Sequence, residues 1–332
     1  MNKWIVVTTI NPPQPAIAAI SNLCVKDGWR CVVVGDKKTP VKWSANNIDY
    51  LSVEDQKQLY PQLSDMLPFN HYCRKNIGYL YAASKGAEVI LETDDDNIPL
   101  ANFGIQLNKK ISGRLVGNAT WVNVYKYFTN ALIWPRGNPL DSIHEKGLVL
   151  HEEYATECPV QQYLADGDPD VDAIYRLLFK DEIRFEKNSP VLLEKGAWCS
   201  FNSQNTIFFR EFFSLLYLPC FVSFRMTDIW RSFVAQAVLW SEGKCLSFSQ
   251  SSVVQVRNQH NLMKDFKDEV DGYLSNRAIC EILMQASAGW TNSMSIKSRV
   301  FSAWSALNAE KYITDDEMDI VKFWMECLSD QA

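Results

Sequence analysis

The 332-residue sequence lacks several features that identify common classes of protein. None of its nine cysteines forms a C-x-x-C pair. Their odd number and scattered positions suit reduced thiols, so we expect a cytoplasmic protein. The motifs G-x-G-x-x-G and G-x-x-x-x-G-K-S/T are also missing, and a dinucleotide-binding or P-loop protein therefore loses its main support.

The sequence also lacks an excess of positive charge and a long apolar run. Lys and Arg total 33 against 39 Asp and Glu, so the formal net charge is -6 and the isoelectric point is near 5.4. We therefore expect no nucleic acid partner. The longest apolar run, residues 212–224, is broken by Ser214, Pro219 and Ser223 and is shorter than the roughly 20 residues of a membrane span. It predicts buried core, with peripheral membrane contact as the alternative.

The order of the predicted elements indicates an α/β fold. The first part of the chain alternates short β-branched runs with helix-period stretches, which is typical of βαβ units and a mostly parallel sheet. From about residue 271 the period is purely helical. We therefore predict an α/β domain over residues 1–270 and a C-terminal α-helical appendage over 271–332. The main predicted elements are strands at 4–9, 30–35, 48–51 and 88–92, helices at 15–26 and 74–85, and capping boxes at 52–55 and 314–317.

The clearest functional signal is a run of three carboxylates, Asp94, Asp95 and Asp96, directly after a predicted strand. Adjacent carboxylates repel one another, so a stable fold needs solvent, hydrogen-bond donors or a cation to offset the repulsion. In an open α/β sheet, ligands bind outside the carboxyl ends of the strands, where this triplet lies. Mg²⁺ or Mn²⁺ takes carboxylate oxygens together with phosphate oxygens and water. The alternative is a solvated turn or a helix N-cap.

Polar residues at neighbouring strand ends match a nucleotide ligand, because small polar loops there can hold a base and a ribose. These residues are Thr8, Thr9, Asn11 and Asp36. Arg74 and Lys75 open a predicted helix, where positive side chains oppose the helix dipole and an anion such as phosphate would compensate them. The alternatives are an ordinary polar loop and an exposed helix start.

A carboxylate in an apolar stretch is a candidate general base. Asp228 lies between Arg225 and Arg231 and beside Trp230, a setting in which it could accept a proton from an attacking hydroxyl. The alternative is a buried ion pair between Asp228 and one of the two arginines. His260 has polar neighbours and by itself indicates a surface histidine.

An acidic turn at residues 166–172 imitates the start of an EF-hand loop. It has no glycine at the sixth position, and Leu177 stands where the bidentate glutamate would be. We therefore expect no Ca²⁺ site there, and the sequence assigns the turn no role.

Five longer motifs occur in the order of a known family. They are residues 72–82 (YCRKNIGYLYA), 92–97 (ETDDDN), 134–140 (WPRGNPL), 165–177 (ADGDPDVDAIYRL) and 224–231 (FRMTDIWR). Over roughly residues 1–265 the chain resembles the STELLO-type glycosyltransferase domain. More distantly, it is similar to the reversibly glycosylated polypeptides, which include nucleotide-sugar mutases.

The resemblance implies a GT-A fold, a Rossmann-like α/β domain that uses a D-x-D motif, Mn²⁺ or Mg²⁺, and a nucleotide-diphosphate sugar. UDP is favoured by the family's tendency. It implies that Asp94 faces the ribose, that Asp96 binds the metal with Asp95 assisting, and that His260 contacts the metal or diphosphate. Asp228 falls where inverting members place their base.

Further contacts follow from the same resemblance. Arg74 or Lys75 would stabilise the negative charge on the leaving diphosphate. Plausible sugar or acceptor contacts are Asn138, Asn205, Trp121, Trp134 and Trp198, although core packing explains each tryptophan equally well.

We therefore expect an inverting, metal-dependent glycosyltransferase that moves a sugar from a nucleotide-diphosphate donor to a glycan or lipid-linked acceptor. Plant STELLO proteins carry a transmembrane anchor that this sequence does not show. This points to a bacterial-type member in surface polysaccharide assembly, located in the cytoplasm or at the inner face of the membrane. The alternatives are a nucleotide-sugar mutase and a non-catalytic scaffold whose C-terminal helices bind a partner, form a homodimer or contact the membrane.

Overall fold

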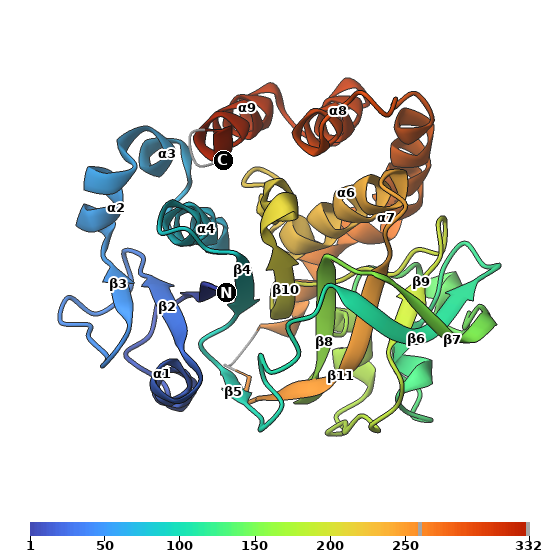
Figure 1. Ribbon diagram of the computed structural model, residues 1–332, viewed down its shortest axis with the longest axis horizontal. Helices are drawn as coiled ribbons and strands as arrows, with labels where there is room; N and C mark the ends of the chain where they lie inside the picture. The colour runs from blue at the N-terminus through green and yellow to red at the C-terminus, as the bar shows by residue number, and fades with distance from the viewer. Residues whose placement is uncertain (258–260, 330–332) are drawn as a thin grey trace.

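The computed structural model describes residues 1–257 and 261–329, and its centre is one eleven-stranded sheet (Figure 1). The spatial order is β3-β2-β1-β4-β10-β8-β11-β9-β6-β7, and β5 pairs with β11 beside this path. The strands are β1 (Lys3–Thr8), β2 (Trp29–Val34), β3 (Asp49–Leu51), β4 (Val89–Thr93), β5 (Asn97–Pro99), β6 (Lys110–Gly117), β7 (Leu148–Glu157), β8 (Val160–Gly167), β9 (Val191–Leu193), β10 (Asn205–Phe209) and β11 (Leu246–Gln255). The predicted α/β class is confirmed, and the arrangement is consistent with a GT-A-like fold.

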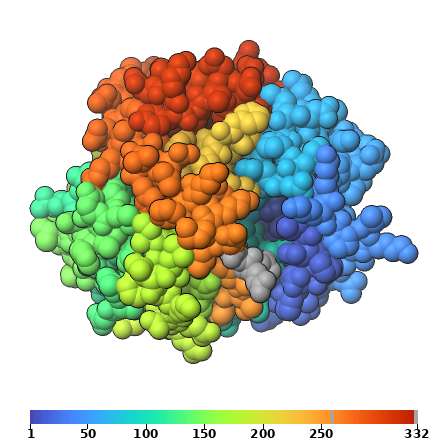
Figure 2. Space-filling view, turned by 180° about the vertical axis from the view of Figure 1, so that it is seen from behind, coloured from blue at the N-terminus to red at the C-terminus, as the bar shows by residue number. Residues whose placement is uncertain are grey.

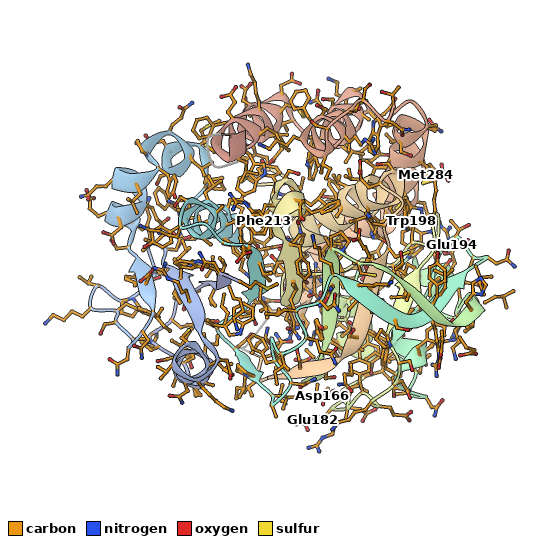
Figure 3. The ribbon with its side chains drawn as sticks, viewed as in Figure 1. Asp166, Glu182, Glu194, Trp198, Phe213 and Met284 are labelled. Carbon is orange, nitrogen blue, oxygen red and sulfur yellow. The ribbon has the colours of Figure 1, made fainter. Side chains whose placement is uncertain are left out.

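Helices cover both faces of the sheet. Helix α1 lies on one face, and α4 and α6 lie on the other, with α7, α8 and α9 stacked outside them (Figure 1). The helices are α1 (Pro15–Asp27), α2 (Val53–Leu59), α3 (Pro61–Met66), α4 (Lys75–Ser84), α5 (Ala173–Leu178), α6 (Thr227–Ser241), α7 (Leu262–Ala288), α8 (Ile296–Ala309) and α9 (Asp315–Ser329). Trp198 and Phe213 are buried between the sheet and this helical layer (Figure 3).

The parallel part of the sheet comes from the first hundred residues, as their βαβ pattern predicts. Strands β1, β2, β3 and β4 pair in parallel, and their apolar residues are buried from both sides. Helix α4 comes close to β1 and β2 because Gly78 has no side chain, since a Cβ there would lie 2.6 Å from Cγ1 of Val6. The capping box predicted at Ser52 is confirmed, with Ser52 and Asp55 each accepting the other's backbone N–H.

Beyond β4 the sheet is mixed. Strand β10 runs antiparallel to both β4 and β8, whereas β11 runs parallel to β8. As a result, one edge of the sheet gathers the carboxyl ends of β1, β2, β4, β8 and β11 together with the start of β10. Chain segments far apart in sequence therefore converge at the edge where the acidic triplet follows β4.

The C-terminal helices share a hydrophobic core with the sheet-covering helices. Helix α7 passes without a break through residues 270 and 271, where the sequence predicts a domain boundary. Buried side chains of α8 and α9, among them Trp304 and Trp324, belong to the same cluster as those of α4 and α6. The division into two domains itself stays a prediction.

Glu317 at the start of α9 links the last helix to the loop after residue 216. Thr314 accepts the backbone N–H of Glu317, as the predicted capping box requires. The Glu317 carboxylate, however, does not return to Thr314, because it accepts the backbone N–H groups of Cys220 and Phe221 and the hydroxyl of Tyr217. Burial raises the pKa of Glu317 above its usual value, and these donors oppose the rise.

Replacing Glu317 with alanine should destabilise the fold, because three buried donors would lose their acceptor. We expect a loss on the order of 2–4 kcal/mol in the free energy of unfolding, measured by urea denaturation at pH 7. Glu326→Ala is the matched control, since Glu326 is exposed on the same helix. Equal stability of the two variants would contradict this role for Glu317.

Candidate active site

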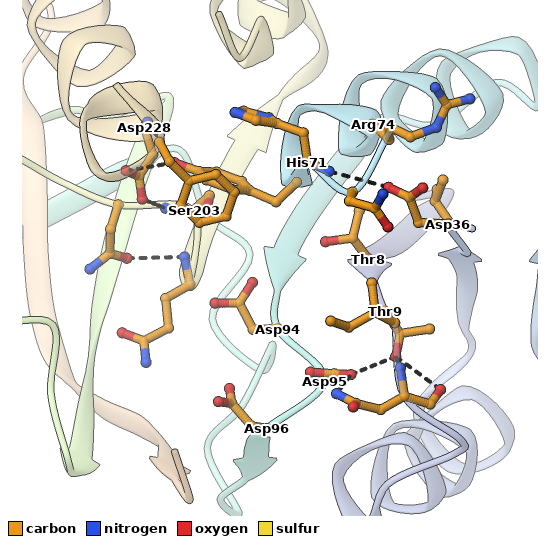
Figure 4. Close-up of a pocket in the computed structure, with 18 of the residues that line it drawn as sticks. Thr8, Thr9, Asp36, His71, Arg74, Asp94, Asp95, Asp96, Ser203 and Asp228 are labelled. Carbon is orange, nitrogen blue, oxygen red and sulfur yellow. Dashed lines mark hydrogen bonds between the residues drawn. The ribbon is translucent and has the colours of Figure 1, made fainter. Parts of the chain in front are cut away.

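A cavity of about 500 Å³ opens at the convergent edge of the sheet (Figure 4). From the opposite side to Figure 1, Figure 2 shows a hollow between the N-terminal part of the chain, in blue, and the region of α7, in orange. Of the residues predicted from the sequence, those that line the cavity are Thr8, Thr9, Asn11, Asp36, Arg74, Asp94, Asp95, Asp96 and Asp228. His260 lies outside the described residues.

The three carboxylates of the triplet point in different directions. Asp94 and Asp96 turn into the cavity, whereas Asp95 turns towards the end of β1 (Figure 4). There Asp95 accepts hydrogen bonds from Oγ1 of Thr9 at 2.5 Å and from Nδ2 of Asn11 at 3.0 Å. Burial raises the pKa of Asp95, and the two donors oppose this rise. Asp95, Thr9 and Asn11 therefore tie β1 to β4.

Asp94 and Asp96 are suited to a hard divalent cation. The Asp94 side chain is 37 % exposed and pairs with Nζ of Lys75 at 2.9 Å, and Asp96 accepts a long hydrogen bond of 3.4 Å from Gln255. Within residues 1–257 and 261–329, no group of three His, Cys, Asp or Glu side chains could hold a metal ion. Mg²⁺ or Mn²⁺ needs only one or two protein carboxylates when phosphate oxygens and water complete its shell, so the residues present fit such an ion.

Arg74 and Lys75 are both buried and engaged with the protein. The Arg74 guanidinium turns away from the cavity (Figure 4) and donates hydrogen bonds to Gln56, Ser64 and the carbonyl of Leu67. Nζ of Lys75 donates to the carbonyls of Thr93 and Ser203, besides pairing with Asp94. In this geometry Arg74 holds the segment before the helix in place, and Lys75 fixes Asp94.

A buried arginine that sequence reasoning did not single out organises the opposite wall. Arg136 pairs with Asp170 at 2.7 Å and with Asp228 at 3.0 Å, and all three side chains are at most 7 % exposed. The only sequence signal for Arg136 is its place in the motif at residues 134–140. Its two partners come from the loop after β8 and from the first turn of α6.

Asp228 forms a buried ion pair, which was the alternative to a general base. Its partner is Arg136 rather than Arg225 or Arg231. Arg225 pairs with Glu269, and Arg231 pairs with Glu92 at the buried end of β4. Asp228 also accepts the backbone N–H of Ser203 and the hydroxyl of Tyr72. Burial would raise the pKa of Asp228, but Arg136 outweighs it and lowers that pKa, so the carboxylate is ionised at neutral pH.

The acidic turn at residues 166–172 holds arginines in place. Asp168 pairs with Arg176 and, at 2.9 Å, with Arg257, while Asp170 binds Arg136. Asp172 caps helix α5 by accepting the backbone N–H of Tyr175. The carboxylates of Asp168, Asp170 and Asp172 thus each bind different partners.

Besides Arg74 and Arg136, two further arginines reach the cavity. Arg225 and Arg257 line it, and Nη2 of Arg257 donates to Oε1 of Gln255 at 3.1 Å. Since the amide of Gln255 also reaches Asp96, Arg257 lies one side chain away from the acidic triplet. The pKa of Arg257 falls to about 10, because burial and the nearby positive charges of Arg176 and Arg225 outweigh its carboxylate partners. Because positive charge dominates around Arg257, its surroundings favour the binding of an anion.

The other predicted sugar contacts lie away from the cavity lining. Asn138 is buried and donates to the carbonyl of Val122, and Asn205 donates to the carbonyl of Leu164. The tryptophans at 121, 134 and 198 are at most 3 % exposed and belong to the hydrophobic core, as the alternative interpretation of each stated.

Comparison with known proteins connects this geometry to a family. A family model described as STELLO glycosyltransferases matches residues 225–331. Two Arabidopsis thaliana proteins, described as probable glycosyltransferases STELLO1 and STELLO2, are each 32% identical to the chain in an alignment of 268 residues that covers 73% of the chain. The chain belongs to the STELLO glycosyltransferase family. It spans about a third of the length of these two relatives, since the match covers 34% of each.

The STELLO match at residues 225–331 includes Arg225 and Asp228 on the cavity wall and continues through α7, α8 and α9. The family signal therefore includes both part of the candidate site and the C-terminal helices that pack behind it. In the part of the chain that the structure describes, no helix is sufficiently long and apolar to span a bilayer.

The ion pair between Asp170 and Arg136 gives a pH-dependent prediction. Burial alone would raise the pKa of Asp170, but Arg136 holds it well below its usual value. Because that pKa is lower in the folded protein than in the unfolded chain, the stabilisation is present above about pH 4 and is lost as the pH falls further. Asp170→Asn should therefore reduce the free energy of unfolding at pH 7 on the order of 3 kcal/mol, and by less near pH 3.

Denaturant unfolding of wild type and variant at several pH values would measure this difference. Asp181→Asn is the control, because Asp181 is exposed on the neighbouring loop. A difference between wild type and Asp170→Asn that stays constant from pH 7 to pH 3 would argue against the ion pair as its source.

Proposed function

We propose that this STELLO family member is a metal-dependent glycosyltransferase that uses a nucleotide-diphosphate sugar, with UDP as the favoured nucleotide. The observation that carries the proposal is that Asp94 and Asp96 open onto the same cavity as Arg225 and Arg257. Carboxylates that can hold a divalent cation, next to arginines that can hold phosphate oxygens, suit a diphosphate. The carboxylates of the lining outnumber its arginines, which favours a cation in the same place.

The nucleoside would lie at the ends of β1 and β2. Thr8 and Asp36 line that end of the cavity, and Asp36 accepts the backbone N–H of His71 at 3.2 Å. This contact joins the loop after β2 to the segment before α4. Thr9 and Asn11 would act indirectly, because their side chains hold Asp95.

The reaction would break the bond between the anomeric carbon and the diphosphate as an acceptor hydroxyl attacks. A divalent cation, when bound, supplies positive charge that stabilises the departing diphosphate. Asp94 and Asp96 would hold that cation, and Lys75 would keep Asp94 oriented. We assign the phosphate contact expected of Arg74 or Lys75 to Arg257, since it lines the cavity next to Gln255.

Asp228 is the candidate base for an inverting transfer. It is ionised, lines the cavity and would take the proton of the attacking hydroxyl. Arg136 would keep the carboxylate oriented and would lower its basicity at the same time. The acceptor is proposed to be a glycan or a lipid-linked sugar. Bacterial surface polysaccharide assembly at the cytoplasmic side of a membrane also belongs to the proposal. It comes from the sequence alone, because the two relatives compared are plant proteins.

Nucleotide binding in the presence and absence of metal tests the proposal. A thermal-shift series with UDP, GDP, CDP and CMP, each with and without Mn²⁺, should show stabilisation by one nucleoside diphosphate only when Mn²⁺ is present. At about 100 times the dissociation constant, a ligand adds roughly 2.7 kcal/mol, which corresponds to several degrees in melting temperature. Asp96→Asn should abolish the shift, and the exposed control Asp181→Asn should keep it.

Absence of a shift with every nucleotide would overturn the glycosyltransferase proposal and favour a scaffold role. Conversion of a UDP-sugar to an isomer without any acceptor would instead identify a mutase.

The role of Arg257 can be separated from that of its neighbours by a matched pair of variants. Arg257→Ala should weaken UDP binding about tenfold and leave uridine binding unchanged, because only the diphosphate is in reach of a guanidinium. Arg176→Ala removes an arginine that pairs with the same Asp168 but does not line the cavity. Isothermal titration that gave equal losses for both variants would mean that Arg257 acts on UDP only through the fold.

A further inference from the structure

Three aromatic rings meet on the wall of the candidate active site. The rings of His71 and Tyr72 both meet the ring of Phe224 edge to face, with centroid distances of 4.9 Å. The His71 and Tyr72 rings stack on each other, with their centroids 5.5 Å apart. All three residues line the cavity. We call these three side chains the aromatic platform. They come from two segments about 150 residues apart, so the fold rather than local sequence assembles them.

Hydrogen bonds hold the platform in position. Nδ1 of His71 accepts the backbone N–H of Cys73 at 3.1 Å, and the backbone N–H of His71 donates to Asp36. The hydroxyl of Tyr72 donates to Oδ1 of Asp228 at 3.2 Å. A platform fixed in this way loses little conformational freedom when a ligand binds to it.

Phe224 exposes an apolar surface inside a cavity that also carries many charged and polar side chains. Its side chain is 42% exposed, although it follows a stretch in which most apolar residues are buried. The rest of the lining is dominated by carboxylates, arginines, amides and hydroxyls. A ligand that suits both surfaces has one apolar face and a polar rim. A pyranose ring has this character, because its C–H groups gather on one face and its hydroxyls project around the edge.

The position of the platform indicates which sugar it would take. Tyr72 touches Asp228, the candidate base, and Phe224 lies four residues before Asp228 at the start of α6. Figure 4 shows His71 and Asp228 on the opposite side of the cavity from Asp95 and Asp96. A sugar stacked on the platform would thus bring a hydroxyl to Asp228, across the cavity from Asp96, one of the two carboxylates assigned to the donor's cation.

We propose that Phe224, together with His71 and Tyr72, forms the acceptor subsite, where the aromatic platform stacks on the apolar face of a neutral pyranose ring. This inference rests on the proposed glycosyltransferase function and adds the chemical class of its acceptor end group. A nucleobase also stacks on aromatic rings, and the experiment distinguishes it from a sugar.

Saturation-transfer NMR with methyl glycosides of glucose, galactose, mannose and N-acetylglucosamine, in the presence of UDP and diamagnetic Mg²⁺, would test the platform. At least one glycoside should bind to the wild type, with the strongest saturation on the ring C–H groups of one face. Phe224→Ala should weaken that binding about tenfold, the size of one stacking contact, and Phe224→Trp should retain it. The matched control is Phe221→Ala, since Phe221 is 47% exposed nearby but does not line the cavity.

UDP binding, measured in the same samples, separates the outcomes. Unchanged UDP binding together with the loss of glycoside binding supports the acceptor subsite. Weaker UDP binding in Phe224→Ala would mean that the platform holds the nucleobase, and this would overturn the inference. Glycoside binding that is absent in the wild type, or unaffected by Phe224→Ala, would overturn it while leaving the proposed function intact if UDP still binds. Failure of UDP to bind to the wild type would count against the proposed function itself.

Discussion

The candidate site depends on one buried interaction, the contact of the Arg136 guanidinium with two carboxylates. Asp170 comes from the loop after β8 and Asp228 from the first turn of α6, so this contact joins three distant segments behind one wall of the cavity. Charges buried this deeply are stable only when they are paired and hydrogen-bonded, and loss of one partner leaves the others uncompensated. The position of Asp228, and through Tyr72 that of the aromatic platform, follows from this contact.

The opposite wall is built on a different principle. Parallel strands β1, β2 and β4 end at one edge, and the triplet after β4 is divided between two tasks. Asp95 ties β4 to β1 through Thr9 and Asn11, which leaves Asp94 and Asp96 directed into the cavity. The repulsion among three adjacent carboxylates is thus relieved by separation, by hydrogen bonds and by Lys75. In the proposed function a divalent cation would supply the remaining compensation.

Local patterns predicted the parts of the molecule that depend on neighbouring residues. The βαβ pattern, the capping box at Ser52 and the triplet at a strand end all follow from short-range sequence. Long-range partners were not predictable in this way: the helix-dipole argument for Arg74 missed Gln56, Ser64 and Leu67, whose oxygens accept its hydrogen bonds. Apart from the place of Arg136 in the motif at residues 134–140, nothing local singled out Arg136 or Arg257, because their importance comes from Asp170 and Asp168, which only the fold brings near them.

In the proposed function, Asp94 and Asp96 would hold a divalent cation against the diphosphate of the donor. Anomalous diffraction from crystals grown with UDP and Mn²⁺ would locate the ion directly. We expect one Mn²⁺ within coordination distance of Asp94 and Asp96 and of the UDP phosphates, with Arg257 also contacting the diphosphate. Mn²⁺ bound elsewhere, or UDP phosphates placed away from the triplet, would contradict it.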